Sequence, residues 1–423
     1  MTEFLEAAVR IGERLCAQAF WAEDRDCCNW MSRTDVEDAS QAASQLASRA
    51  IGAHLYAGSG GIALFLLELA RITGRDVFAC TAVGAARHAA RSFRRNAGPA
   101  STLSHFSGVL GLASVSARIA EVVGSTSLDE DLDWAVETAA SKLSEPHPID
   151  VMGGNAGAIP PLIHLWRRLG RQDCLDLAMA CGRDICRAAT WSGEACMWDA
   201  LISSGPMFRS PPVTGYSHGA SGLALAVLEL HAAGAGGDLA LHTARGAWHY
   251  EDSLFDPETD NWIDVRFPFH RESGHYQGTS QVAWCHGASG IALARARAAS
   301  LDVGAAAEHR HMAERGIATT LAAMSRNITV PRHDTSLCHG LSGLGEIVLT
   351  CGQLLGDPTW TDAALNFGRR LVTLYGDGDA WPSAAPSGGP SPTLMIGDAG
   401  VGYHLLRLHD PHAVPSILIT LPD

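Results

Sequence analysis

A turn of the form G-x-x-G recurs seven times along the chain of 423 residues, and an apolar helical stretch follows each copy. The glycine pairs are Gly58/Gly61, Gly108/Gly111, Gly154/Gly157, Gly219/Gly222, Gly287/Gly290, Gly340/Gly343 and Gly397/Gly400. Successive first glycines are 46 to 68 residues apart, which leaves room for two helices and their loops in each repeat. Repeats of this size are typical of folds in which each unit buries its apolar face against its neighbours.

The helices predicted from this pattern are of two kinds. The segment from Gly61 to Ala70 is apolar on nearly every side, which is typical of a helix buried all round. Helices with one polar face lie between such segments, at residues 78–93, 132–143, 174–189, 305–324 and 360–375. The sequence therefore predicts an all-α fold, an α/α toroid (a double-layered helical barrel) of seven inner and seven outer helices. All seven glycine turns should lie at one end of it.

We expect residues 1–423 to form a single domain of this kind. Residues 252–278 hold polar and aromatic side chains without a helical period. They predict either a flap over the mouth of the barrel, where it would touch a bound peptide, or a disordered excursion.

Charge and hydropathy exclude several classes of function. The chain has 31 basic and 45 acidic residues and no basic run, so it lacks the cations with which proteins neutralise nucleic-acid phosphates. Charged residues interrupt the apolar positions at the N-terminus, which therefore lacks the continuous apolar stretch of a signal peptide. No stretch reaches the ~18 uncharged apolar residues that a membrane span needs. We expect a cytoplasmic protein that binds no nucleic acid, whose eleven cysteines are free thiols or metal ligands.

Equivalent positions of the repeats contain a cluster of metal-ligand residue types. The residue before the first glycine is histidine in three successive repeats (His218, His286 and His339), and cysteine precedes it in two of them (Cys285 and Cys338). If equivalent positions lie at equal heights around one mouth, these side chains converge there. Thiolate and imidazole are ligands that zinc prefers, and two cysteines with one histidine would leave a coordination place open for water or substrate.

These motifs resemble those of a known family. The segments GYSHGASG (215–222), WCHG (284–287) and LCHG (337–340) are similar to the three signature motifs of the lanthionine synthetase C-like cyclases. The seven turns, which extend over most of the chain, resemble that family's α/α toroid. Residues 250–266 and the Cys-His-Gly form of the second motif look most like the cyclase domain of class II bifunctional lanthipeptide synthetases. Only that cyclase part is matched, which implies either a separate dehydratase or a free-standing relative.

The resemblance implies roles for five residues. Cys285, Cys338 and His339 match the ligands of a catalytic Zn²⁺ ion. His218 matches the family's catalytic histidine, and Asp150, just ahead of the third glycine turn, matches its catalytic aspartate. Asp150 could orient the imidazole of His218 or take the proton that a substrate thiol loses.

Three residues around the second motif have open roles. Gln281 stands where stand-alone class I cyclases tend to carry arginine, which leaves open how a substrate carbonyl is polarised. His286 stands where those enzymes tend to carry tyrosine. It would close the site as a fourth ligand or act on substrate from outside the coordination sphere, and we expect the latter because adjacent residues rarely ligate the same tetrahedral ion. Trp284 could pack beside the metal or belong to the core.

The implied activity is a zinc-dependent cyclisation of a ribosomally made peptide. Cysteine thiols of the dehydrated precursor peptide add to dehydroalanine or dehydrobutyrine and form lanthionine or methyllanthionine thioether rings. Metal coordination deprotonates a thiol, and an imidazole suits the protonation of the resulting enolate because it titrates near neutral pH. The alternatives are a peptide- or thiol-binding protein of this family, or an enzyme that adds an external thiol such as glutathione. The presence of Asp150 and His218 favours chemistry over capture.

Overall fold

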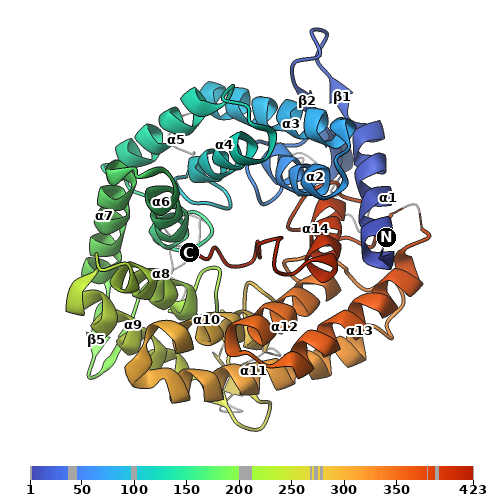
Figure 1. Ribbon diagram of the computed structural model, residues 1–423. Coiled ribbons are helices and arrows are strands. Elements are labelled where there is room, and N and C mark those ends of the chain that lie inside the picture. Colours follow the sequence, from blue (N-terminus) through green and yellow to red (C-terminus); the bar gives the residue numbers. More distant parts are fainter. Residues whose placement is uncertain are drawn as a thin grey trace.

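The computed structural model describes residues 2–36, 45–96, 102–199, 212–266, 269–270, 275–276, 280–378, 380–385 and 390–422. In these residues fourteen α-helices form two concentric rings (Figure 1). The predicted α/α toroid of seven inner and seven outer helices is thereby confirmed.

The inner ring is made of the helices that follow the glycine turns. They are α2 (Ser59–Thr73), α4 (Val109–Val123), α6 (Asn155–Leu169), α8 (Ala220–Ala232), α10 (Ala288–Leu301), α12 (Leu341–Leu355) and α14 (Asp398–His409). Each begins at the residue directly after the first glycine of its turn. They are buried on most sides, and in α8 every residue from Ala220 to Leu230 is buried.

The outer ring consists of amphipathic helices that cover the inner ones. They are α1 (Glu3–Gln18), α3 (Asp76–Arg95), α5 (Asp129–Lys142), α7 (Gln172–Ala188), α9 (Gly237–Asp252), α11 (Ala306–Asn327) and α13 (Pro358–Tyr375). A 3₁₀ turn, Val303–Ala305, precedes α11. Each outer helix from α3 onward packs against the inner helix that precedes it in the chain, whereas α1 packs against α14 and so closes the ring (Figure 1).

The second glycine of each turn is required by a close backbone approach. A Cβ at Gly343 would lie 1.9 Å from the carbonyl oxygen of Leu337, and the same contact with the carbonyl six residues earlier recurs in all seven turns. The first glycine has extended backbone in six turns, and only Gly287, with φ of +80°, adopts a conformation that disfavours other residues. Close approach, more than positive φ, therefore explains the motif.

Backbone hydrogen bonds join the glycine turns into a closed ring. The donor and acceptor pairs are Tyr56 N–Phe106 O (2.9 Å), His105 N–Gly157 O (3.1 Å), Val151 N–Ser217 O (3.1 Å), Ser217 N–Cys285 O (3.1 Å), Trp284 N–Cys338 O (3.1 Å), Cys338 N–Met395 O (2.9 Å) and Met395 N–Tyr56 O (2.9 Å). Because the series returns to its starting turn, all seven turns lie together at one end of the barrel. Equivalent positions of the repeats therefore lie around one mouth of the barrel, as expected.

Short strand pairs, which the sequence analysis did not predict, occur in the connections. The described antiparallel pairs are β1 (Phe20–Trp21) with β2 (Cys28–Asn29), β3 (Met31–Val36) with β4 (Gln45–Ala50), β5 (Thr190–Ser192) with β6 (Ala195–Met197), β7 (Phe255–Asp256) with β8 (Asn261–Trp262), and β9 (Phe269–His270) with β10 (His275–Tyr276). Most are too short for a period of two to be recognised. Of the predicted flap at 252–278, residues 267–268, 271–274 and 277–278 lie outside the described residues.

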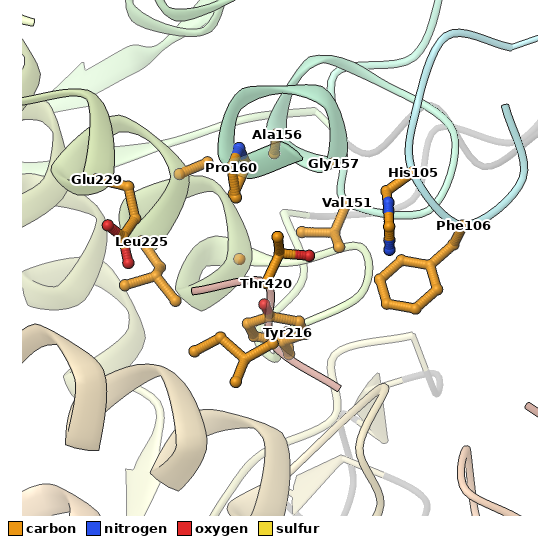
Figure 2. Close-up of a pocket in the computed structure, with 13 residues that line it drawn as sticks. His105, Phe106, Val151, Ala156, Gly157, Pro160, Tyr216, Leu225, Glu229 and Thr420 are labelled. Carbon is orange, nitrogen blue, oxygen red and sulfur yellow. The ribbon is translucent and has the colours of Figure 1, made fainter. Parts of the chain in front are cut away.

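The C-terminal segment 410–422 crosses the inside of the ring from α14 toward α6 and α8 (Figure 1). The indole Nε1 of Trp284 donates a hydrogen bond of 2.9 Å to the carbonyl oxygen of Leu418 in this segment. Thr420 and Tyr216 line a cavity of only about 20 Å³ beside it (Figure 2). The polypeptide segment 410–422 therefore fills this part of the interior, so no open pore runs through it.

Within the described helices, none combines the length and apolar character needed to cross a bilayer.

The glycine contacts predict a stability difference between two Gly→Ala variants. At Gly400 the new Cβ would lie 1.8 Å from the carbonyl oxygen of Leu394, so the backbone must move. We expect Gly400→Ala to lower the free energy of unfolding by about 2 kcal/mol or more. At Gly52 the nearest atoms would be 3.7 Å away, and Gly52→Ala should unfold like the wild type. Thermal or denaturant unfolding measures both, and equal stabilities would contradict the proposed reason for the motif.

Candidate active site

Two neighbouring glycine turns bring three metal-ligand side chains together. Cys285 lies in the turn before α10, and Cys338 and His339 lie in the turn before α12. The backbone bond from Trp284 N to Cys338 O holds these turns side by side. The ligand atoms of the three side chains lie within 4.8 Å of one another, and Cys338 Sγ is 3.2 Å from His339 Nε2. We call Cys285, Cys338 and His339 the Cys-Cys-His group.

The three side chains of the Cys-Cys-His group shift one another's pKa values. Hydrogen bonds from the Cys338 thiol and from His339 outweigh burial and lower the pKa of Cys285 below its usual value. Burial and the neighbouring thiolate raise the pKa of Cys338, and the hydrogen bond to Cys285 raises that of His339. Two thiols and an imidazole at this spacing fit a tetrahedral divalent ion with ligand bonds of about 2.0–2.3 Å. Within the described part of the chain, these three residues could hold such an ion.

A cavity of about 290 Å³ adjoins this group. Its lining residues are Tyr56, Met152, Ser217, His218, Arg266, Gln281, Trp284, Cys285, His286, Cys338 and His339. The two cysteines are buried, whereas His218 and His339 are exposed, so a molecule in solvent can reach the cavity. Seven of the eight residues predicted for the site therefore line one space.

The eighth predicted residue, Asp150, reaches the cavity through His218. Its Oδ2 lies 2.5 Å from His218 Nδ1, and its Oδ1 accepts a bond of 2.8 Å from the backbone N–H of Gly153, which fixes the carboxylate. The two residues belong to adjacent turns, which the bond from Val151 N to Ser217 O joins. Because Nδ1 is engaged, Nε2 is the ring nitrogen left for a substrate.

His286, Gln281 and Trp284 have distinct surroundings. His286 is buried, lies outside the Cys-Cys-His group, and stacks on His218 with 5.8 Å between ring centroids. Burial lowers the pKa of His286 to about 4, so the ring is neutral at pH 7. The backbone carbonyl oxygen of Gln281 accepts a hydrogen bond from the side-chain Nδ2 of Asn261. Trp284 is completely buried and packs on Phe106, which agrees with a core role.

Four cavity residues (Tyr56, Met152, Ser217 and Arg266) were missed by the sequence analysis, and two of them bring an ionisable group to the cavity. The hydroxyl of Tyr56 hydrogen-bonds to the Cys338 thiol, and burial raises the pKa of Tyr56 above its usual value. Tyr56 occupies the same repeat position as Cys285 and Cys338, so the comparison of repeats contained its signal. The other is Arg266, which lies in the segment 250–266 that resembles class II cyclases.

The segment 250–266 supports both the His218 turn and the Cys285 turn. Glu251 is completely buried and accepts hydrogen bonds from the backbone N–H of Gly215 (2.9 Å) and from Ser221 Oγ (2.5 Å). Burial raises the pKa of Glu251 to about 7. Asn261 bonds to the backbone on both sides of the Cys285 turn, at the carbonyl of Gln281 and the N–H of Ala288. One connection thus fixes two parts of the site.

Comparisons with known proteins give the family and the fold of the chain. The family model described as "Lanthionine synthetase C-like protein" matches residues 50–419. Nisin cyclase has a similar structure, with a TM-score of 0.65 and 18% identity over 85% of this chain and 89% of that chain, which shows a shared fold. Unsaturated glucuronyl hydrolase from Bacillus sp. GL1 matches over 98% of this chain and 99% of its own at 15% identity, with a TM-score of only 0.41. Because the family model matches most of its length, the chain belongs to the lanthionine synthetase C-like family.

Proposed function

We propose that the protein is a zinc-dependent lanthionine cyclase that acts on a dehydrated peptide supplied by a separate dehydratase. The observation that carries the proposal is the meeting of the Cys-Cys-His group and the His218–Asp150 pair at one cavity. Membership of the family and the fold shared with nisin cyclase support it. A binding protein would need the first group but not the second.

The Cys-Cys-His group would hold the zinc ion with one coordination place left for substrate, since His286 lies outside it. Zinc bound there would lower the pKa of the substrate cysteine thiol, so that the thiolate forms at neutral pH. The side chains of Cys285 and Cys338 are buried, which excludes water from two sides of the group.

The His218–Asp150 pair carries the proton that the addition moves. Sulfur bonds to the β-carbon, the alkene π electrons shift toward the carbonyl, and the enolate then needs a proton at the α-carbon. His218 takes the thiol proton at Nε2 and returns it to the α-carbon, while Asp150 holds the ring through Nδ1. A positioned acid–base group of this kind contributes typically about 10²–10⁴-fold in rate.

The most direct test of the proposed function uses the zinc-loaded protein and a synthetic peptide with one dehydroalanine and one cysteine. Cyclisation is an isomerisation, so we expect the alkylatable thiol to disappear while the peptide mass stays unchanged. In a parallel sample that also contains glutathione, addition of this external thiol would raise the peptide mass instead. Mass spectrometry after alkylation distinguishes these outcomes, and an unchanged thiol count would contradict the proposal.

The ligand assignment predicts the metal content of two cysteine variants. Cys338→Ala removes one of three ligands, so we expect it to lose zinc. Cys351→Ala removes a buried thiol from α12 that lies outside the Cys-Cys-His group, and it should keep about one zinc per chain. Metal analysis of the purified variants measures this. Full zinc in Cys338→Ala would refute the assignment.

The proton-transfer assignment predicts that His218→Asn keeps its zinc but cyclises about 10²-fold more slowly or worse. The matched control is His311→Asn, because His311 is exposed on α11 and is not among the residues that line the cavity. Metal analysis and turnover of the same samples give both readouts. Wild-type turnover in His218→Asn would remove the residue from the mechanism.

A further inference from the structure

The addition step needs one group that the residues discussed so far do not supply. When sulfur bonds to the β-carbon, negative charge develops on the carbonyl oxygen of the dehydroamino acid until the α-carbon is protonated. Fixed donors aimed at such an oxygen are usually the largest single contribution to catalysis. His218 serves the α-carbon, and Gln281 offers only an uncharged amide.

Arg266 places a permanent positive charge at the cavity. Its side chain lines the cavity together with Cys285, His286 and His339, and its charge interacts with all three. It is partly exposed, with 28% of the side chain accessible, so its polar end can meet a molecule from solvent. Within the described residues, it is the only arginine or lysine that lines this cavity.

The position of Arg266 is fixed by the chain around it. Asn261 ties the segment to the Cys285 turn through the carbonyl of Gln281 and the N–H of Ala288. Further along, Thr214 Oγ1 bonds to the carbonyl oxygen of Ile263. Just before Arg266, the segment is therefore anchored both to the turn that carries His218 and to the turn that carries Cys285.

Asp264 orients the guanidinium of Arg266. Oδ1 of Asp264 accepts bonds from the backbone N–H (3.1 Å) and from Nε (2.9 Å), and Oδ2 accepts one from Nη2 (2.5 Å). Burial alone would raise the pKa of Asp264, but Arg266 outweighs it and holds the pKa below its usual value. Arginine has five N–H donors, and this pairing uses two of them. No acceptor for Nη1 is found in the part of the chain that the structure describes.

A purely structural role does not explain this pairing. Asp264 and Arg266 are two residues apart in one loop, so their ion pair joins no two elements of the fold. It does hold the planar fork in one orientation at the cavity, and within the described residues the Nη1 donors have no partner. Such a pre-oriented cation is suited to a planar oxygen acceptor.

We propose that Arg266 is a further catalytic residue, which binds the carbonyl oxygen of the dehydroamino acid and stabilises the enolate. This proposal rests on the proposed cyclase function. The carbon–sulfur bond forms as the α,β double bond is lost, and the thiol proton ends on the α-carbon, so no oxidant or reductant is needed. Arg266 keeps its own protons throughout, and Asp264 acts as its positioning residue.

The test compares zinc-loaded Arg266→Gln, Arg266→Lys and Arg315→Gln with the wild type, on the dehydroalanine–cysteine peptide. Arg315 is the matched control because it pairs with Asp260 at the turn between β7 and β8 but does not line the cavity. We expect Arg266→Gln to lower kcat by about 10²–10³-fold, with less change in KM. Arg266→Lys keeps the charge without the fork and should lose less. Arg315→Gln should match the wild type.

Zinc content and the unfolding midpoint of each variant are the readouts that a structural role would move. Arg266→Gln should keep both at the wild-type values. Three results would overturn the proposal: an unchanged kcat in Arg266→Gln, an effect on KM alone, or loss of zinc together with activity. An inactive wild type would instead overturn the proposed function, so the two failures are distinguishable.

Discussion

The closed ring of backbone hydrogen bonds between the glycine turns is the interaction on which the site depends. It joins seven turns whose residues are widely separated in sequence, and it sets Cys285 and Cys338 side by side although they are 53 residues apart. The second glycine of each turn makes this possible, because any Cβ there would collide with a carbonyl oxygen. Since the bonds are made by main-chain atoms, the side chains at the mouth can vary without loss of the ring.

Seven nearly equivalent positions thus carry different chemistry in different sectors. The sector of α10 and α12 carries the Cys-Cys-His group, and the sector of α6 and α8 carries the His218–Asp150 pair. The segment 250–266 links the two sectors through Glu251 and Asn261, and it delivers Arg266 to the cavity between them. In the proposed reaction the Cys-Cys-His group acts on the sulfur, the His218–Asp150 pair on the α-carbon, and Arg266 on the carbonyl oxygen. These three atoms lie close together in the substrate.

The repeat made the helical architecture and the grouping of ligands predictable. Gly58 to Gly400 give the period, and the cysteines and histidines before the glycines are visible once the repeats are compared. Arg266 could not be found in this way, because it lies in a loop without periodicity, whose path is set by hydrogen bonds of Asn261 and Thr214. The strand pairs and the position of the C-terminal segment inside the ring could not be predicted for the same reason. They depend on single contacts such as that of Trp284 with Leu418, which leave no pattern in sequence.

The central claim is that Cys285, Cys338 and His339 bind one zinc ion and leave it a vacant coordination place. X-ray absorption spectroscopy of the zinc-loaded protein, before and after addition of a cysteine-containing peptide, measures this directly. The account predicts two sulfur ligands at about 2.3 Å with two nitrogen or oxygen ligands, one of which is replaced by a third sulfur when the peptide is added. A coordination shell already closed by four protein atoms, and unchanged by the peptide, would contradict it.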